Sequence, residues 1–394
     1  MKTLDQIKAE TPIDPTQPDF SYPYAINTSG SYYLTGNLTV SGGNAINVNA
    51  NGVTLDLNGF TISSTASAAS GNGVFLNNVH DVAILNGHIV GGVTYNGSSF
   101  SGGPGFLSGI IYAFPGADPA NIHVSGVSVS GCTQTGIELG SEYSDVVDHC
   151  TIRTVGGQGI HAGVVSDSTA YQCGSNAINS VTATGCYGVS VAGGHGVFSY
   201  TAMNCYGISA SGQGINTLSA SDCYGVSTSS TGVSAGTAQN CYGVSTSGLG
   251  VFTNNAAQNC QGVSTSGTGL LSNGNAINSS GMASGSGYGL ATNANAMNCS
   301  GANTATNSTG GGIFAQNASN CVGQSFGYYG IQVNGTAISC EGLSQNGAGI
   351  RAVVAAFSNG QAAASNCAIT ATIGIGCTSF GGSLCFNNHY LMPP

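Results

Sequence analysis

The chain has 394 residues, and its 14 acidic residues against 4 basic ones give a net charge of −10, with only 5% of residues charged. A nucleic-acid groove needs clustered Lys and Arg to neutralise phosphates, so this composition excludes a nucleic-acid partner. No segment approaches the roughly 18 consecutive apolar residues of a membrane span, so we expect no membrane insertion. The 64 glycines, with abundant Ser, Thr and Asn, disfavour helices and favour strands joined by tight turns.

Residues 1–30 predict an N-terminal cap and a lead-in. Residues 3–9 fit a short helix, with Thr3 as its N-cap and Gln6 at the capping-box position. Such a cap would cover the open edge of the first coil. Residues 10–23 hold four prolines and predict irregular structure. The first ten residues contain no apolar run, so we expect no signal peptide there. The localisation stays open between the cytoplasm, export by another route and assembly into a larger particle.

Strands are predicted from residue 31 onward, where apolar and polar residues alternate with period 2 and Gly or Asn falls between the runs. The pattern of residues 55–62 recurs at 83–90, a period of 28 residues. We therefore expect long coils over residues 31–150.

One insertion interrupts these coils at residues 94–121, and it is too long for a simple turn. It is rich in aromatic residues, namely Tyr95, Phe100, Phe106, Tyr112 and Phe114. One interpretation is a loop folded against the flank of the coils. The other is an aromatic contact surface for sugar rings or for another subunit, with these five residues as candidate ligand contacts.

The charged residues gather where the long coils give way to short ones. Gly136-Ile-Glu-Leu-Gly and Gly159-Ile-His-Ala-Gly align as successive rungs, which predicts that Glu138 and His161 lie about 4.8 Å apart along the strands' stacking direction. Asp148 and Arg153 fall in the coil between them. A Glu–His pair could serve as general acid and base, with Arg153 holding an anionic group. The simpler interpretation is a solvated outer face with opposite charges on neighbouring rungs.

A six-residue box then repeats through the short coils of residues 151–385. Its cysteines, 18 or 19 residues apart, are Cys186, Cys205, Cys223, Cys241 and Cys260. A constant period near 20 indicates a solenoid. Because alternate side chains of a strand point to opposite faces, we expect Cys inside and the following Tyr outside, with the Gly of the box permitting the turn.

The cysteine ladder predicts buried free thiols rather than a disulfide framework. Neighbouring rungs nevertheless lie within the Cα separation that a disulfide tolerates, so occasional bridges stay open. A bridge between two of Cys367, Cys377 and Cys385 stays open for the same reason. Residues 386–394 are expected to form a C-terminal cap or tail.

The opening strands, from Gly30-Ser-Tyr-Tyr-Leu-Thr-Gly-Asn-Leu to Val53-Thr-Leu-Asp-Leu-Asn-Gly, resemble right-handed parallel β-helix proteins of the pectin-lyase-like superfamily. The Asn-Cys-Tyr-Gly boxes resemble the short coils of uncharacterised bacterial members. The resemblance implies an all-β fold: a single right-handed parallel β-helix of about 15–17 coils with a cap at each end. It implies no one activity, because the superfamily includes lyases, hydrolases, phage tailspikes and adhesins.

The lyases of that superfamily use an Arg or Lys base and a calcium site held by clustered acids. Neither is evident here, and no metal or cofactor is predicted. Gly194-His195-Gly196 matches the motif of galacturonan hydrolases, but the Asp residues and the Arg-x-Lys that accompany it there are missing.

The sequence therefore favours a structural or binding solenoid without evident catalytic machinery, which contacts a polysaccharide or associates with itself. The alternative is a carbohydrate-active enzyme, either a polysaccharide lyase or a glycoside hydrolase, that uses Glu138, His161, Arg153 and Asp148. A minor alternative is an ice-binding surface, suggested by the three-rung row Thr228, Thr246 and Thr265.

Overall fold

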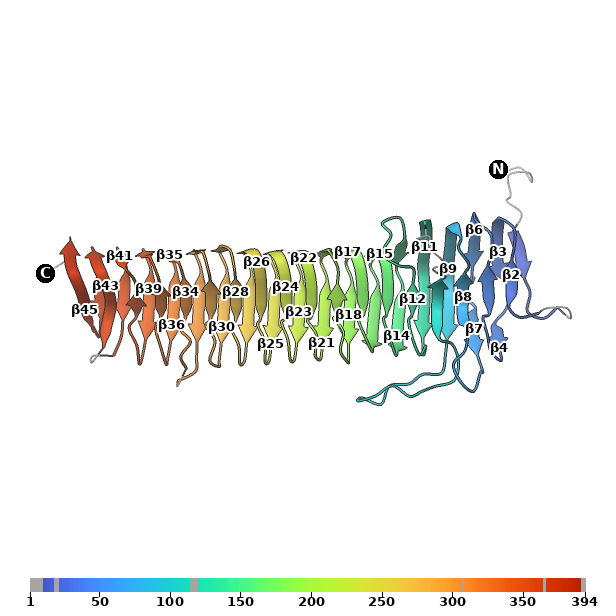
Figure 1. Cartoon of the computed structure of the whole chain (residues 1–394), viewed down its shortest axis with the longest axis horizontal. Helices are drawn as coiled ribbons and strands as arrows, with labels where there is room; N and C mark the ends of the chain where they lie inside the picture. Colours follow the sequence, from blue (N-terminus) through green and yellow to red (C-terminus); the bar gives the residue numbers. More distant parts are fainter. Residues whose placement is uncertain (1–9, 18–20, 114–119, 307, 364–365, 391–394) are drawn as a thin grey trace. The chain divides into compact units, whose positions relative to one another are not determined.

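The computed structural model describes residues 10–17, 21–113, 120–306, 308–363 and 366–390, which form 45 β-strands and no helix (Figure 1). Paired strands run parallel, each beside a strand of the next coil. The fold is a right-handed parallel β-solenoid of about 19 turns, so the predicted fold class is confirmed. The expectation of about 15–17 coils is too low, because the first and last coils extend into the segments expected to be lead-in and tail.

The chain divides into two compact units, Met1–Tyr206 and Gly207–Pro394. The strands of the first unit are β1 (Glu10–Ile13), β2 (Tyr24–Ile26), β3 (Gly30–Leu34), β4 (Leu38–Val40), β5 (Ile46–Val48), β6 (Val53–Asp56), β7 (Thr61–Ser64), β8 (Asn72–Leu76), β9 (His80–Val90), β10 (Ser108–Tyr112), β11 (Ala120–Ser130), β12 (Ile137–Glu138), β13 (Val146–Asp148), β14 (Thr151–Val155), β15 (Ile160–Ser166), β16 (Thr169–Cys173), β17 (Ile178–Thr184), β18 (Tyr187–Ser190), β19 (Val197–Phe198) and β20 (Thr201–Met203).

Strand β21 (Tyr206–Ser209) spans the boundary between the units. The strands of the second unit are β22 (Ile215–Ser221), β23 (Tyr224–Ser227), β24 (Val233–Gln239), β25 (Tyr242–Ser245), β26 (Val251–Gln258), β27 (Gln261–Ser264), β28 (Leu270–Ser272), β29 (Ala276–Ile277), β30 (Ser280–Ala283), β31 (Leu290–Thr292), β32 (Asn295–Met297), β33 (Ser300–Asn303), β34 (Ile313–Ala315), β35 (Asn317–Ser319), β36 (Val322–Ser325), β37 (Ile331–Val333), β38 (Thr336–Ile338), β39 (Glu341–Ser344), β40 (Ile350–Arg351), β41 (Val354–Ala356), β42 (Asn359–Gln361), β43 (Cys367–Ile375), β44 (Thr378–Phe380) and β45 (Ser383–Tyr390).

The two ends of the chain enter the strand ladder further than expected. Residues Glu10–Ile13, expected to be irregular, form β1 and pair in parallel with β3, so that expectation is wrong for these four residues. The predicted helix at residues 3–9 lies outside the described residues. At the other end, the expected tail from Phe386 onward begins inside β45, which pairs with β43. Residues 391–394 lie outside the described part of the chain.

The core of the first unit becomes thinner along the chain. One inward row, in strand register, shrinks from large to small side chains: Leu55, Ile84, Val124, Val147, Val165, Ala183 and Ala202. All of these side chains are fully buried. Smaller inward residues allow the facing strands to approach each other, so the short coils of this unit enclose a narrower core than the long ones.

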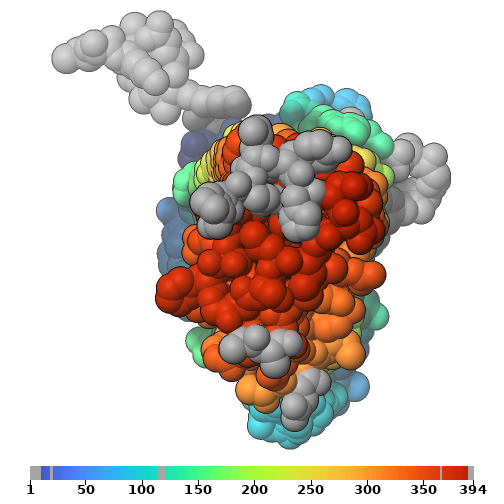
Figure 2. All heavy atoms as spheres, turned by 90° about the vertical axis from the view of Figure 1, so that its left-hand side faces the viewer, coloured from blue at the N-terminus to red at the C-terminus, as the bar shows by residue number. Residues whose placement is uncertain are grey.

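The second unit keeps one core composition from coil to coil. A large aliphatic row is formed by Ile215, Val233, Val251, Leu270, Leu290, Ile313, Ile331, Ile350 and Ile369, all fully buried. A row of alanines runs beside it, from Ala220 to Ala355. Figure 2 views this unit from its C-terminal end, where the red atoms of the last coils form a continuous surface wherever grey atoms do not cover them.

The predicted orientation of the Cys-Tyr box is confirmed. Cys223 and Cys241 are buried, whereas the Tyr224 and Tyr242 rings face outward, half-buried, with their centroids 5.0 Å apart. The turn is made by the residue before each Cys: Asn240, for example, has φ of 52°. A short polar side chain tolerates this left-handed conformation better than other non-glycine residues do.

The expectation that the Gly of the box permits the turn is wrong. Gly225 and Gly243 point inward, where the coil is thinnest. A Cβ added to Gly225 would stand 2.1 Å from the carbonyl oxygen of Gly232 in the same coil. The glycine is required because two backbones meet across the core with no side chain between them.

Twelve cysteines are free and buried, in agreement with the predicted ladder of thiols. Cys367 and Cys385 form a disulfide, one of the pairings that the sequence left open, with Cα atoms 5.8 Å apart. It joins the neighbouring strands β43 and β45.

Candidate functional site

The predicted contact between Glu138 and His161 is confirmed. They are register partners on β12 and β15. Their chain neighbours Ile137, Leu139 and Ile160 are fully buried. Because successive side chains of a strand point to opposite faces, the carboxylate and the imidazole point outward. His161 Nδ1 lies 2.5 Å from Glu138 Oε1. The side chains are only 20% and 15% exposed, so this pair is largely shielded from water.

A third residue, Ser141, completes this group. Its Oγ lies 2.9 Å from His161 Nε2, on the opposite edge of the ring from Glu138. Gly140, with φ of 95°, turns the chain out of β12, and Ser141 follows it at an exposed position. Sequence reasoning missed this serine because it lies in the loop between β12 and β13. The spacing of the rungs predicts which strand residues are neighbours but not where a loop side chain points.

Asp148 belongs to a different group. It lies on β13, where its Oδ1 is 3.2 Å from His123 Nε2 and its Oδ2 is 3.6 Å from His149 Nδ1. Partial burial alone would raise the pKa of Asp148. Hydrogen bonds from Ser125 and His123, together with the nearby His149, outweigh that effect and hold the pKa below its ordinary value. Asp148 therefore stays ionised near neutral pH, where it is the hydrogen-bond partner of His123 and an electrostatic partner of His149.

The structure does not bring Arg153 to the Glu138–His161 pair. Arg153 is exposed on β14, where its register partners are Ser130 and Tyr171, and the described residues give it no ion pair. The four charged side chains that we expected to group thus lie on four strands, β12, β13, β14 and β15, and only Glu138 and His161 contact each other.

The described aromatic residues of the insertion fall into two groups, one in an outer loop and one in the core. Tyr95 and Phe100 lie in a loop between β9 and β10 (Figure 1), bridged to each other with ring centroids 4.8 Å apart. Phe106 and Tyr112 are 0% and 2% exposed, so their assignment as ligand contacts is wrong: they fill the core as the chain rejoins it. Phe114 lies outside the described residues.

The Tyr95–Phe100 pair folds back toward the coils. A Cβ added to Gly174 would stand 3.2 Å from an edge carbon of the Phe100 ring. Both rings are only half-exposed, which agrees with a loop lying on the flank. They stay candidates for ligand contact.

The Glu138–His161 pair stands in a longer outward row. In strand register the half-exposed side chains are Phe75, Ile111, Glu138, His161, Asn179 and Phe198. Phe198 stacks on His195 with centroids 5.5 Å apart, which gives the histidine of the Gly-His-Gly motif a packing role. The acid and the base therefore lie on a strip with apolar residues at both ends.

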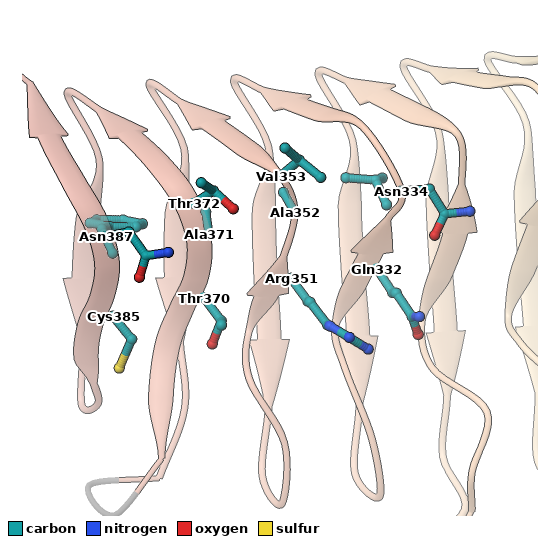
Figure 3. A pocket seen from close by; sticks show the side chains of 12 residues that line it. Gln332, Asn334, Arg351, Ala352, Val353, Thr370, Ala371, Thr372, Cys385 and Asn387 are labelled. Atoms are coloured by element: carbon teal, nitrogen blue, oxygen red, sulfur yellow. The ribbon is translucent and has the colours of Figure 1, made fainter.

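A groove with a volume of about 610 Å³ lies on the second unit. Gln332, Arg351, Thr370 and Cys385 come from the successive strands β37, β40, β43 and β45 and line it (Figure 3). The guanidinium of Arg351 is directed along the groove toward Gln332. Amide and hydroxyl groups from further residues, namely Asn334, Thr372 and Asn387, complete its polar lining.

An aromatic cluster borders this groove. The Arg351 guanidinium lies 5.4 Å from the centroid of the Tyr329 ring, and Tyr329 packs on Tyr328 at 4.2 Å. Tyr288 contacts Phe314 at 5.4 Å, and its hydroxyl lies 3.4 Å from Gln332 Oε1. The cation–π contact fixes the position of the guanidinium. Sequence reasoning missed this groove, because its aromatic and polar residues come from six different coils and form no motif.

Among the described residues, no group of three or more His, Cys, Asp or Glu side chains is arranged to hold a metal ion. The described part of the chain also contains no helix that is long and apolar enough to cross a membrane.

Comparison with known proteins gives no family. No family model matches the sequence, and no curated protein matches it. Among solved structures, the chain is similar to full-length tailspike protein 2 from Escherichia coli O157:H7 bacteriophage CAB120, at 13% identity and a TM-score of 0.29. The match covers 76% of this chain and 43% of the tailspike, so it spans less than half of that protein.

Proposed function

We propose that this protein is a structural and binding β-solenoid whose second unit contacts carbohydrate. The observation that carries this proposal is the groove of about 610 Å³ lined by Gln332, Arg351 and Thr370, with Tyr329 at its border. The solenoid supplies the scaffold, since backbone pairing between coils holds each lining residue at a fixed rung.

The chemistry of the groove suits a sugar chain. Amide and hydroxyl side chains can both donate and accept hydrogen bonds, which matches sugar hydroxyls. An aromatic ring offers a flat apolar face for the C–H face of a pyranose. Arg351 is the only Lys or Arg of the second unit, so the ligand is a neutral carbohydrate or one with a single anionic group at this position.

Binding to a glycan array, followed by titration of the best ligand, tests this proposal. Loss of the charge-assisted hydrogen bonds in Arg351→Ala should weaken binding by roughly 10- to 100-fold, which corresponds to about 1.5–3 kcal/mol. Tyr329→Ala should also weaken it. Arg153→Ala is the matched control, because it removes an exposed arginine from the first unit and should leave affinity unchanged. Absence of any glycan ligand, or unchanged affinity of Arg351→Ala, would contradict the proposal.

A lyase or glycoside hydrolase that uses Glu138, His161, Arg153 and Asp148 together has less support. Asp148 contacts His123 instead of the Glu138–His161 pair, and Arg153 lies beside Ser130 and Tyr171 on β14. Membership of the pectin-lyase-like superfamily and self-association are also part of our proposal; the first is supported by the opening strand motifs. The exposed row Thr228, Thr246 and Thr265 keeps an ice-binding surface as a minor alternative.

A further inference from the structure

The first unit contains an arrangement of side chains that carbohydrate binding does not explain. His161 lies between a hydroxyl and a carboxylate, with Ser141 Oγ 2.9 Å from Nε2 and Glu138 Oε1 2.5 Å from Nδ1. We propose that Ser141, His161 and Glu138 form a serine-hydrolase triad that cleaves esters of short acyl groups.

The hydrogen bonds determine the tautomer. An ionised carboxylate can only accept, so the hydrogen between Glu138 and the ring belongs to Nδ1. In the neutral imidazole Nε2 then carries a lone pair, and the Ser141 hydroxyl donates to it. This is the protonation state in which a histidine can act as general base toward a serine, with the acid holding the ring in orientation.

The loop presents the serine outward. Gly140 has φ of 95°, which places Ser141 on an exposed turn directly after the buried Leu139. The turn is fixed at its far end, because the Asp145 N–H donates to Glu142 O at 3.0 Å and Val164 N–H donates to Asp145 O at 2.9 Å. The attacking atom is thus accessible, while Glu138 and His161 beneath it are shielded.

A backbone N–H next to the nucleophile can donate a hydrogen bond to the developing oxyanion. The backbone N–H of Glu142, the residue after the nucleophile, donates no hydrogen bond to the described residues. In hydrolases with an exposed serine on a turn, the N–H of the residue after the nucleophile commonly serves as one such donor.

Each step balances. Ser141 Oγ attacks the ester carbonyl carbon and its proton passes to His161 Nε2; the C–O bond to the alcohol then breaks, and the leaving oxygen takes that proton. Water next gives a proton to Nε2 and attacks the acyl carbon. The bond to Ser141 Oγ breaks, Oγ recovers the proton, and a carboxylic acid leaves. The sum is ester plus water giving alcohol plus acid, with no other reactant.

The surroundings favour an acyl ester over a glycoside. Glycoside hydrolysis uses two carboxylates across the scissile bond, whereas the group across the His161 ring from Glu138 is a hydroxyl. The site lies on an outward strip between Ile111 and Asn179, so the alcohol portion of the substrate can extend along the rungs. This inference does not rest on the groove of the second unit.

The test uses the full chain and two probes, a fluorophosphonate that labels activated serines and p-nitrophenyl acetate. Wild type should become labelled at Ser141 and should release nitrophenol, and Ser141→Ala should abolish both. Glu138→Gln should lower turnover by about ten-thousandfold, because the amide stabilises the wrong tautomer. His161→Gln should lower it to a similar extent. Ser229→Ala, which removes another exposed serine, should match wild type.

Circular dichroism of each variant establishes that the fold is retained. Absence of labelling and turnover in folded wild type would overturn the triad. Labelling that survives in Ser141→Ala, or unchanged turnover in Glu138→Gln, would do so as well.

Discussion

Gly188 and Gly196 face each other across the core so closely that a Cβ on Gly188 would stand 2.1 Å from the Gly196 carbonyl oxygen. Neither residue has the left-handed backbone that usually explains a glycine. The same opposition recurs in later coils, as between Gly243 and Gly250. The absence of side chains at these positions therefore sets the thickness of the coil.

Gly188→Ala should consequently be severely destabilising. The new methyl group meets backbone atoms, which cannot move without breaking the strand ladder, so we expect a loss of about 3 kcal/mol or more in the free energy of unfolding. Gly193→Ala in the same coil is the control, because its Cβ would meet nothing within 4 Å. Denaturant unfolding of both variants measures the difference, and equal stabilities would contradict the close-approach explanation.

Replacement of Phe357 by Asn should stabilise the second unit. Phe357 has φ of 47° and is 64% exposed, so an aromatic residue occupies a left-handed turn without gaining burial. Asn occupies the equivalent turn at Asn320, with φ of 52°. The gain should be about 1 kcal/mol. Phe380→Asn is the control: that side chain is 70% exposed but lies in strand β44, where Asn is disfavoured, and should give no increase in the melting temperature.

The cysteine ladder predicts a loss of stability in alkali. Burial raises the pKa of the Cys132 and Cys150 thiols from 9.0 to about 12. Below pH 9 both the folded and the unfolded chain keep these protons. Between pH 9 and 12 only the unfolded chain releases them, so the free energy of unfolding falls by up to about 1.4 kcal/mol per pH unit for each thiol.

Denaturant unfolding at several pH values between 8 and about 11 measures this slope. The double variant Cys132→Ala, Cys150→Ala should show a shallower slope, whatever stability it loses to the cavities. An identical slope in the variant would show that other groups cause the alkaline effect.

The Cys367–Cys385 disulfide should hold the last coil in place. The bridge closes a segment with a sequence separation of 18 residues, for which the restriction of the unfolded chain is worth about 3 kcal/mol. Dithiothreitol should lower the melting temperature of wild type but not that of Cys367→Ser, Cys385→Ser, because the remaining twelve cysteines are already free. A further decrease in the double variant would refute this assignment.

The sequence predicted the register between similar coils but not how the chain turns at the corners between strands. The contact of Glu138 with His161 followed from aligning two similar rungs, since register in a solenoid is set by coil length. The position of Arg153 could not be obtained in this way, because the corners between β12, β13 and β14 decide which face each strand presents. Ser141 lies in one of those corners, and its direction depends on the backbone of Gly140.

Core position was predictable for repeated residues and unpredictable for single ones. The inward direction of Cys223 followed from the alternation along its strand. Phe106 and Tyr112 carried no such signal, because the chain leaves and rejoins the core within the insertion. The box glycine was misinterpreted because a sequence shows that a side chain is missing but not what stands opposite.

The identical register of neighbouring coils makes the coil a unit of inheritance as well as of structure. Tyr224 pairs with Tyr242 and Ile215 with Val233, each 18 residues further along. Loss of residues 224–241 would join Cys223 directly to Tyr242, and every inward row would re-form across the junction. Duplication of the same segment would add one rung in the same way. Such a chain can change its length in whole coils during evolution without a new core, so that reach and binding chemistry can be selected separately.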